Sequence, residues 1–277
     1  ETSGYYADFG GVRRMAKAVA EGFVYDGQFS TYRGRRHGAS SHGRPGERFV
    51  VCSQNHDQVG NRALGDRLGP LTSPESLRLA AAVVLLSPGV PLLFMGEEYG
   101  ETAPFLYFVD HSDEALIEAV RRGRCEEFAS FAWSGEVPDP QAPETFRRSR
   151  LHRELIRQPR HAALREYYRE LIRLRKDIPA LAVPDRRQTA VVPFEEEKTL
   201  LVRRWRGDSH VAAIYHFGDG FEWRGEVPAG TWRVVLDSAD PRWQGPGSAV
   251  DRRAVSEGFL SLTLGAKQAV VLAREED

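Results

Sequence analysis

Cysteine and long unbroken apolar runs are scarce in this sequence. Only two cysteines occur among 277 residues, Cys52 and Cys125, too few for a disulfide framework in a chain of this length. We therefore expect a reducing compartment, the cytoplasm. The most apolar stretch, residues 79–95, approaches the length of a membrane-spanning helix, but a Ser-Pro-Gly sequence at 87–89 divides it. Each half is predicted to be a buried element of a globular fold, so no membrane association is expected.

An excess of charge of either sign is also absent. Lys and Arg number 38 against 39 Asp and Glu, a formal net charge of −1. This balance argues against a nucleic-acid-binding surface and suits an uncharged substrate. No Gly-rich phosphate loop follows a predicted strand, and no Gly-x-Ser-x-Gly nucleophile motif occurs. His37 and His42 share a loop without further ligands at metal-like spacing, so no metal site is expected.

An apolar strand, a capped helix and a second apolar strand follow one another in the first third of the chain. Phe49–Cys52 is a continuous apolar run of strand length, typical of buried parallel strands. Ser-Pro-Glu at 73–75 supplies a helix N-cap, and the helix that follows, 77–86, is apolar on nearly every face. Val90–Met95 is predicted to be a second buried strand. This order predicts a βαβ unit and a parallel sheet.

The residue composition and the spacing of apolar residues change at about residue 180. Before it, a short helix is predicted over 12–20, and apolar residues between Leu164 and Ile172 have the spacing of a helix that packs one stripe on a core. After it, short segments rich in β-branched and aromatic residues alternate with turn residues, which predicts an antiparallel β-domain. We therefore predict two domains, 1–180 and 181–277. The second contains four tryptophans that are either core residues or a sugar-stacking platform, namely Trp205, Trp223, Trp232 and Trp243.

Polar residues follow the first predicted strand directly, in the sequence Ser-Gln-Asn-His-Asp-Gln at 53–58. In a barrel of parallel strands, the loops at the carboxyl ends of the strands build the active site. A carboxylate and an imidazole at this point are therefore placed for catalysis. By itself Asn-His-Asp is a short string that a helix cap or a turn also explains, and the residues alone leave both interpretations open.

The order of the surrounding elements is more specific than the motif itself. An apolar strand, Asn-His-Asp at 55–57, a capped helix and the string Phe-Met-Gly-Glu-Glu at 94–98 resemble strand seven, helix seven and strand eight of the α-amylase superfamily of glycoside hydrolases. The resemblance covers essentially the whole chain. It implies an α/β fold, in which 1–180 is the C-terminal part of a (β/α)8 TIM barrel (about strands 7 and 8 with helices 6 to 8) and 181–277 is an antiparallel β-sandwich. Three further stretches are similar to the maltooligosyltrehalose trehalohydrolases of that superfamily, namely 4–8, 22–38 and 104–111.

The resemblance also implies roles for individual residues. Asp57 matches the third catalytic carboxylate, which stabilises the oxocarbenium-like transition state, and His56 would bind hydroxyl groups of the same sugar. Further candidates for substrate binding are Gln58 and Arg62 on the same loop, and Tyr32 and Arg33 in a loop expected on the far side of the scissile bond. The last two are equally explained as a packed loop aromatic and a solvated arginine.

Two of the three carboxylates that the family requires are missing from this chain. A retaining glycosidase needs a nucleophile and a general acid about 5–5.5 Å apart. In the family these follow the fourth and fifth strands, whereas Glu1 falls after the sixth. We therefore expect the chain alone to be inactive and to need a missing N-terminal part of the same enzyme. Glu97 and Glu98 are not substitutes, since neighbouring side chains point in diverging directions; we expect them to order the site or its loop.

Two classes of function follow from these observations. As part of an enzyme, the chain would help to cleave the α-1,4 bond next to the terminal trehalose of maltooligosyl trehalose, with retention and with neither metal nor organic cofactor. A glycogen branching enzyme is the alternative within this class. The other class is a non-catalytic carbohydrate-binding or structural unit, which the absence of acid and nucleophile favours. In each case the expected ligand is an α-glucan oligosaccharide.

Overall fold

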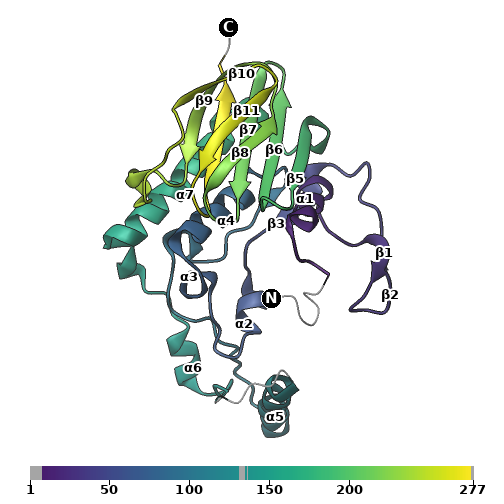
Figure 1. Ribbon diagram of the computed structural model, residues 1–277. Helices are drawn as coiled ribbons and strands as arrows, with labels where there is room; N and C mark the ends of the chain where they lie inside the picture. The colour runs from purple at the N-terminus through teal and green to yellow at the C-terminus, as the bar shows by residue number, and fades with distance from the viewer. Residues whose placement is uncertain (1–7, 131–134, 136, 276–277) are drawn as a thin grey trace. The chain divides into compact units, whose positions relative to one another are not determined.

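The computed structural model describes residues 8–130, 135 and 137–275 (Figure 1). Glu1 and residues 4–7, which contribute to the resemblance, lie outside the described residues. The chain forms two compact units. Unit 1 consists of Glu1–Val51, Glu75–Leu92 and Glu166–Asp277, and unit 2 consists of Cys52–Pro74 and Leu93–Arg165. The domain boundary at residue 180 stays a prediction.

The C-terminal segment of unit 1 folds into antiparallel β-structure (green to yellow in Figure 1). Its strands are β5 (Thr189–Phe194), β6 (Thr199–Arg206), β7 (Ser209–His216), β8 (Phe221–Glu226), β9 (Gly230–Asp237), β10 (Arg253–Ser256), β11 (Phe259–Leu264) and β12 (Ala269–Arg274). Six of them form one sheet in the order β10-β9-β12-β7-β6-β5, and β11 pairs with β8. The antiparallel sheet predicted from the sequence is therefore present.

One apolar core serves both of these sheets. It includes Leu201 from β6, Trp223 from β8 and Leu262 from β11. Along β11 buried and exposed residues alternate, as expected for a strand with one face on a core. Trp232 and Trp243 are also buried, which makes them packing residues, whereas Trp205 is partly exposed. The core interpretation thus holds for three of the four tryptophans considered above.

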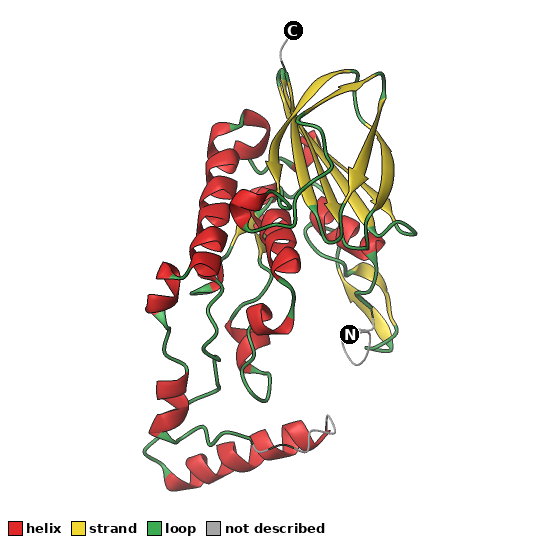
Figure 2. Ribbon diagram, turned by 60° about the vertical axis from the view of Figure 1, so that its left-hand side comes forward, coloured by secondary structure: helices red, strands yellow, loops and turns green. Residues whose placement is uncertain are grey.

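The N-terminal part of unit 1 contains a helix and a hairpin. Helix α1 (Val12–Glu21) matches the prediction for 12–20 and begins at main-chain N–H groups that donate to the carboxylate of Glu195, at 3.3 Å from Val12 and 2.7 Å from Arg13. An acidic group at this end is favourable because the helix dipole is positive there. Strands β1 (Asp26–Ser30) and β2 (Arg35–Gly38) form the antiparallel hairpin drawn in yellow near the N-terminus in Figure 2.

The predicted βαβ unit is present in unit 1, but its strands are short. Strands β3 (Val50–Val51) and β4 (Val90–Pro91) pair in parallel, and the buried helix α4 (Pro74–Leu86) connects them. The expectation that both strands are buried is wrong, because Val50 is 64% and Val90 39% exposed. Within the described residues each strand pairs only with the other. Within the described part of the chain each of the two strands therefore keeps one open edge.

Two arginines hold the C-terminal end of α4. Arg175, from helix α7 (Pro159–Asp177), donates to three main-chain oxygens between residues 85 and 89 at 2.5–2.9 Å. Arg204 of β6 donates to the carbonyl oxygen of Leu86 at 3.0 Å. Carbonyl groups at a helix end lack partners within the helix, and cations are favourable there. Burial lowers the pKa of Arg204 to about 10, so its guanidinium remains charged at neutral pH.

The remaining helices are short or amphipathic. The apolar stripe predicted for 164–172 is the buried face of α7, where Tyr167 and Leu171 are fully buried. Within the described ranges, every helix is too short or too polar to span a bilayer. The other helices are α2 (His56–Gly60), α3 (Leu68–Leu71), α5 (Glu114–Ser130), α6 (Pro143–Arg148) and α8 (Pro179–Ala182), with 3-10 turns at Gly46–Arg48, Glu97–Tyr99, Arg153–Arg157, Arg186–Gln188 and Pro241–Trp243.

Arg175→Gln is expected to lower the free energy of unfolding by about 2 kcal/mol, because partly buried carbonyl groups lose charge-assisted hydrogen bonds. Arg173→Gln is the matched control on the same helix. Its guanidinium forms exposed ion pairs with Glu170 and Asp177, and such pairs contribute less than about 1 kcal/mol. Urea denaturation followed by circular dichroism measures both. Equal losses in the two variants would contradict the role given to Arg175.

Candidate functional site

Asp57 lies in the first turn of α2, whose start is fixed by a capping box. The Asn55 side chain accepts a hydrogen bond from the Asp57 N–H at 2.8 Å, and the Gln58 side chain accepts one from the Asn55 N–H at 2.9 Å. Such reciprocal bonds satisfy N–H groups that the helix itself cannot pair. The side chains of His56 and Asp57 take no part in the box, and they are 70% and 69% exposed. The carboxylate thus faces outward and not into an apolar interior.

The exposed polar groups on and after α2 form two pairs. The Nε2 atom of His56 is 3.3 Å from Oδ1 of Asp57, and Nε of Arg62 is 3.3 Å from Oδ2 of Asp66. Exposed pairs of this kind add little to stability. A carboxylate beside an imidazole can accept from and donate to the hydroxyl groups of a sugar. The geometry therefore suits a polar, uncharged ligand.

Tyr32 and Arg33 belong to unit 1, in the turn between β1 and β2. Tyr32 is half exposed, and the Arg33 guanidinium lies over the Tyr25 ring at 5.7 Å from its centroid. The Arg33 N–H donates to the Ser30 hydroxyl at 3.0 Å, which fixes the turn. The four other predicted site residues lie on one short segment of unit 2, 56–62.

Two buried polar residues behind this segment connect it to the loop after β4. Gln54 donates to the carboxylate of Glu97 at 3.4 Å and accepts from the Leu68 N–H at 2.9 Å. The Glu97 carboxylate also accepts from the Phe94 N–H at 3.1 Å. Glu97 thus orders the loop, as expected for it. The role of Gln54 was not predicted, although its place directly after a strand was a usable signal.

Two buried charged residues, Arg67 and Glu101, were not predicted from the sequence. Arg67 donates to the carbonyl oxygens of Met95 and Ala103, both at 2.7 Å. Glu101 accepts from the N–H groups of Thr102, Ala103 and His152 at 2.7–2.8 Å and from the Tyr99 hydroxyl at 2.8 Å. In the sequence both look like ordinary solvated charges, so no pattern signals their burial.

The loop passes Glu101 so closely that glycine is required at one position. Gly96 has a φ of +88°, and a Cβ atom there would lie 2.7 Å from the Cβ of Glu101. The positive φ and the lack of space for a Cβ atom each exclude a larger residue. Burial raises the pKa of Glu101, but the hydrogen bonds that the carboxylate accepts outweigh burial and bring its pKa below the usual value. Glu101 is therefore a buried anion at neutral pH.

The two thiols differ in environment. Cys52, at the start of unit 2, is partly buried, and Nδ2 of Asn55 lies 3.9 Å from its sulfur. Burial raises the pKa of the Cys52 thiol, which disfavours the reactive thiolate. Cys125 on α5 is exposed. Among the described residues no group of three or more His, Cys, Asp or Glu side chains is arranged to hold a metal ion.

Comparison with known proteins assigns this chain to a family. No family model matches the sequence. The chain is 46% identical over 223 residues to a malto-oligosyltrehalose trehalohydrolase of Rhizobium sp. strain M-11, covering 79% of this chain, and 36% identical over 98% of this chain to one from Deinococcus radiodurans. A crystal structure from Salmonella typhimurium titled a putative alpha amylase superposes on 99% of the chain with a TM-score of 0.78 and 37% identity. The chain belongs to the α-amylase family.

The family resemblance inferred from the motifs is thereby confirmed. The matched region is only part of each relative. It covers 37% of the Rhizobium protein, 43% of the Deinococcus protein and 44% of the Salmonella structure. The chain therefore spans less than half the length of these relatives.

Glu101→Gln is expected to flatten the dependence of stability on pH in the acid range. The folded-state pKa of Glu101 is lowered, so its ionised form stabilises the fold above the unfolded-state value of 4.5. This contribution is lost as the pH falls through 4.5 towards the lower folded-state value. Urea midpoints at several pH values between about 3 and 7 measure the effect.

Glu144→Gln is the matched control for this comparison. Glu144 is an exposed carboxylate on α6, in the same unit as Glu101. Its variant should keep the acid dependence of the unsubstituted chain. A Glu101→Gln curve parallel to that of the control would show that Glu101 does not titrate with folding.

Proposed function

We propose that this chain is the C-terminal part of a retaining glycoside hydrolase that acts on maltooligosyl trehalose. The enzyme cleaves the α-1,4-glucosidic bond next to the terminal trehalose unit and releases trehalose. The observation that carries the proposal is the 46% identity to a relative named for this activity. The outward-facing Asp57 on α2 supports it, since a stabilising carboxylate must reach the substrate. The cysteine usage supports a cytoplasmic location.

We further propose that β3, α4 and β4 are strand seven, helix seven and strand eight of a TIM barrel, with a β-sandwich after it. The parallel pairing of β3 with β4 and the open edge of each strand support this assignment. A barrel of eight strands leaves no open edge. The rest of a longer polypeptide would supply the other strands, together with the nucleophile and the general acid.

In this proposal Asp57 acts on the charge that develops during bond cleavage. The anomeric carbon becomes positive in the transition state, and a carboxylate held in place lowers its energy more than that of the ground state. The Asn55–Gln58 capping box holds the main chain of Asp57, so the carboxylate needs little reorganisation. His56, 3.3 Å away, binds hydroxyl groups of the same glucosyl unit.

The other proposed contacts are peripheral to this step. Gln58 retains its amide Nε2 for a sugar hydroxyl, because its Oε1 closes the capping box. Arg62 reaches the ligand from the end of the same segment, where Asp66 orients it. The half-exposed Tyr32 offers a ring face for stacking on a glucosyl ring, and Arg33 donates beside it.

Asp57→Asn in the full-length enzyme is expected to lower kcat by about 1000-fold or more, because the amide lacks the charge that stabilises the transition state. Asp113→Asn is the matched control, an exposed aspartate at the start of α5 in the same unit, which has no role in the proposed site. Initial rates of trehalose release measure both. A near-normal rate for Asp57→Asn would remove this residue from its role.

The product of the full-length enzyme distinguishes the proposal from a branching enzyme. Incubation with maltooligosyl trehalose should yield free trehalose and a shortened maltooligosaccharide, whereas new α-1,6 branches in the glucan would show the alternative activity. The present chain alone should give no turnover in the same assay. Turnover at ordinary enzymatic rates by the chain alone would mean that its residues include the nucleophile and the acid.

A further inference from the structure

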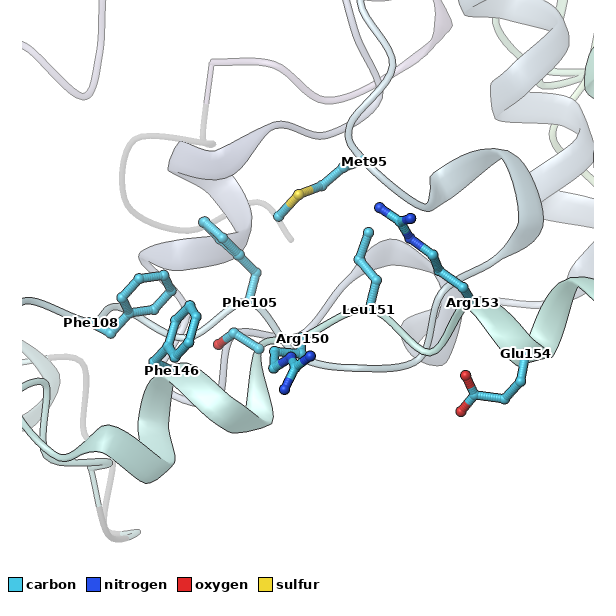
Figure 3. Close-up of a pocket in the computed structure, with 9 residues that line it drawn as sticks. Met95, Phe105, Phe108, Phe146, Arg150, Leu151, Arg153 and Glu154 are labelled. Carbon is cyan, nitrogen blue, oxygen red and sulfur yellow. The ribbon is translucent and has the colours of Figure 1, made fainter.

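Unit 2 contains a cavity that none of the roles assigned above uses (Figure 3). Its volume is about 470 Å³, within the range of small-molecule sites. Figure 3 shows Met95 and Phe105 facing Leu151 and Arg153 across it, with the rings of Phe108 and Phe146 beyond Phe105. The lining residues come from the loop after β4 and from the segment at and after α6. Segments about 50 residues apart therefore build it together.

One side of the cavity is a series of aromatic rings in edge-to-face contact. Phe94 and Phe105 have centroids 5.3 Å apart, Phe105 and Phe108 6.0 Å, and Phe108 and Phe146 5.3 Å. This arrangement is favourable for ring pairs and holds each ring in place. The last ring, Phe146, is 52% exposed. A rigid aromatic surface is thus offered to a ligand in the cavity.

The other side of the cavity is polar. Arg150, Arg153 and Glu154 line it and are exposed. Within the described residues the guanidinium groups of Arg150 and Arg153 form no hydrogen bond or ion pair with a protein group, whereas many other arginines of unit 2 do so. In Figure 3 the Arg153 side chain points to the cavity and the Glu154 carboxylate away from it. The guanidinium groups on this side of the cavity are therefore available to donate hydrogen bonds to a ligand.

The aromatic side also touches the segment that carries Asp57. The Phe105 N–H donates to the Gly65 carbonyl oxygen at 2.8 Å. A Cβ atom at Gly60, the last residue of α2, would lie 3.6 Å from the Phe105 ring. Phe105 therefore packs against the helix on which Asp57 lies. A ligand in the cavity and a ligand at Asp57 would therefore contact the same small structural element.

We propose that this cavity is a binding subsite for a glucosyl unit of an α-1,4-glucan, additional to the position at Asp57. A glucosyl ring has an apolar C–H face that packs on the exposed Phe146 ring, which Phe108 holds by an edge-to-face contact, and hydroxyl groups that accept from Arg150 and Arg153. A free inorganic anion would use the arginines but gain nothing from the aromatic side. The identity of the sugar rests on the proposed function, whereas the combination of ring faces and free donors rests on the structure.

The test measures binding of maltoheptaose by isothermal titration calorimetry to the full-length enzyme with Asp57→Asn, whose low kcat keeps the sugar intact during the titration. Adding Phe146→Ala should raise the Kd about ten-fold, as truncation of an aromatic anchor does. Arg153→Gln should also raise it, through loss of donors. In the enzyme with Asp57 intact, each substitution should raise KM and leave kcat unchanged, the pattern of a residue that binds the substrate and its transition state equally.

Phe259→Ala is the matched control, since Phe259 is 51% exposed but lies on β11 in unit 1. Unchanged maltoheptaose binding in both Phe146→Ala and Arg153→Gln would overturn the proposal. A lower Tm of the full-length enzyme with unchanged binding would do so as well, because it would show that other parts of the polypeptide pack into the cavity. Failure to release trehalose would overturn the proposed function alone, since calorimetric binding does not depend on that reaction.

Discussion

Unit 2 depends on two buried ions that bind main chain and not each other. Arg67 and Glu101 are almost fully buried, and most of their hydrogen bonds go to the backbone around residues 95–103. Glu101 also accepts from the His152 N–H and from the Tyr99 hydroxyl. Ala103 is held from both sides, with its carbonyl oxygen on the arginine and its N–H on the carboxylate. Burying a charge is costly unless strong hydrogen bonds offset its loss of hydration. Glu101 accepts several such bonds, and Arg67 donates through Nε and Nη1 while its Nη2 is buried without a hydrogen-bond partner among the described residues; together these bonds fix the path of the loop.

The fixed path of the loop at residues 95–103 positions other residues of unit 2. Glu97 lies on the same loop and bonds to Gln54, directly before the capped segment that carries Asp57. Met95, also on the loop, lines the aromatic cavity. Rigid main chain thus surrounds side chains that remain exposed and free to meet a ligand. Such preorganisation is what a site needs if its polar groups are to act without rearrangement.

The sequence predicted those features that depend on local pattern. Apolar periodicity located α7, turn spacing located the antiparallel strands, and the order of strand, polar motif and capped helix located Asp57 and indicated the family. Features that depend on residues far apart in the chain were not predicted. Arg67 looks solvated until Ala103 is beside it, and the contact between Phe108 and Phe146 joins positions 38 residues apart. The exposure of Val50 was missed because an apolar run indicates a strand but does not reveal its neighbours.

The contrast between the two thiols has a practical consequence for studying motion. Cys125 is exposed and should react promptly with an alkylating reagent, whereas Cys52 is partly covered, and burial raises the pKa of its thiol. Cys52 directly precedes the segment that carries Asp57, and its sulfur lies against Asn55 of the capping box. Once Cys125 is replaced by serine, the alkylation rate of Cys52 therefore reports how often that segment opens. A ligand that restrains the segment would lower this rate.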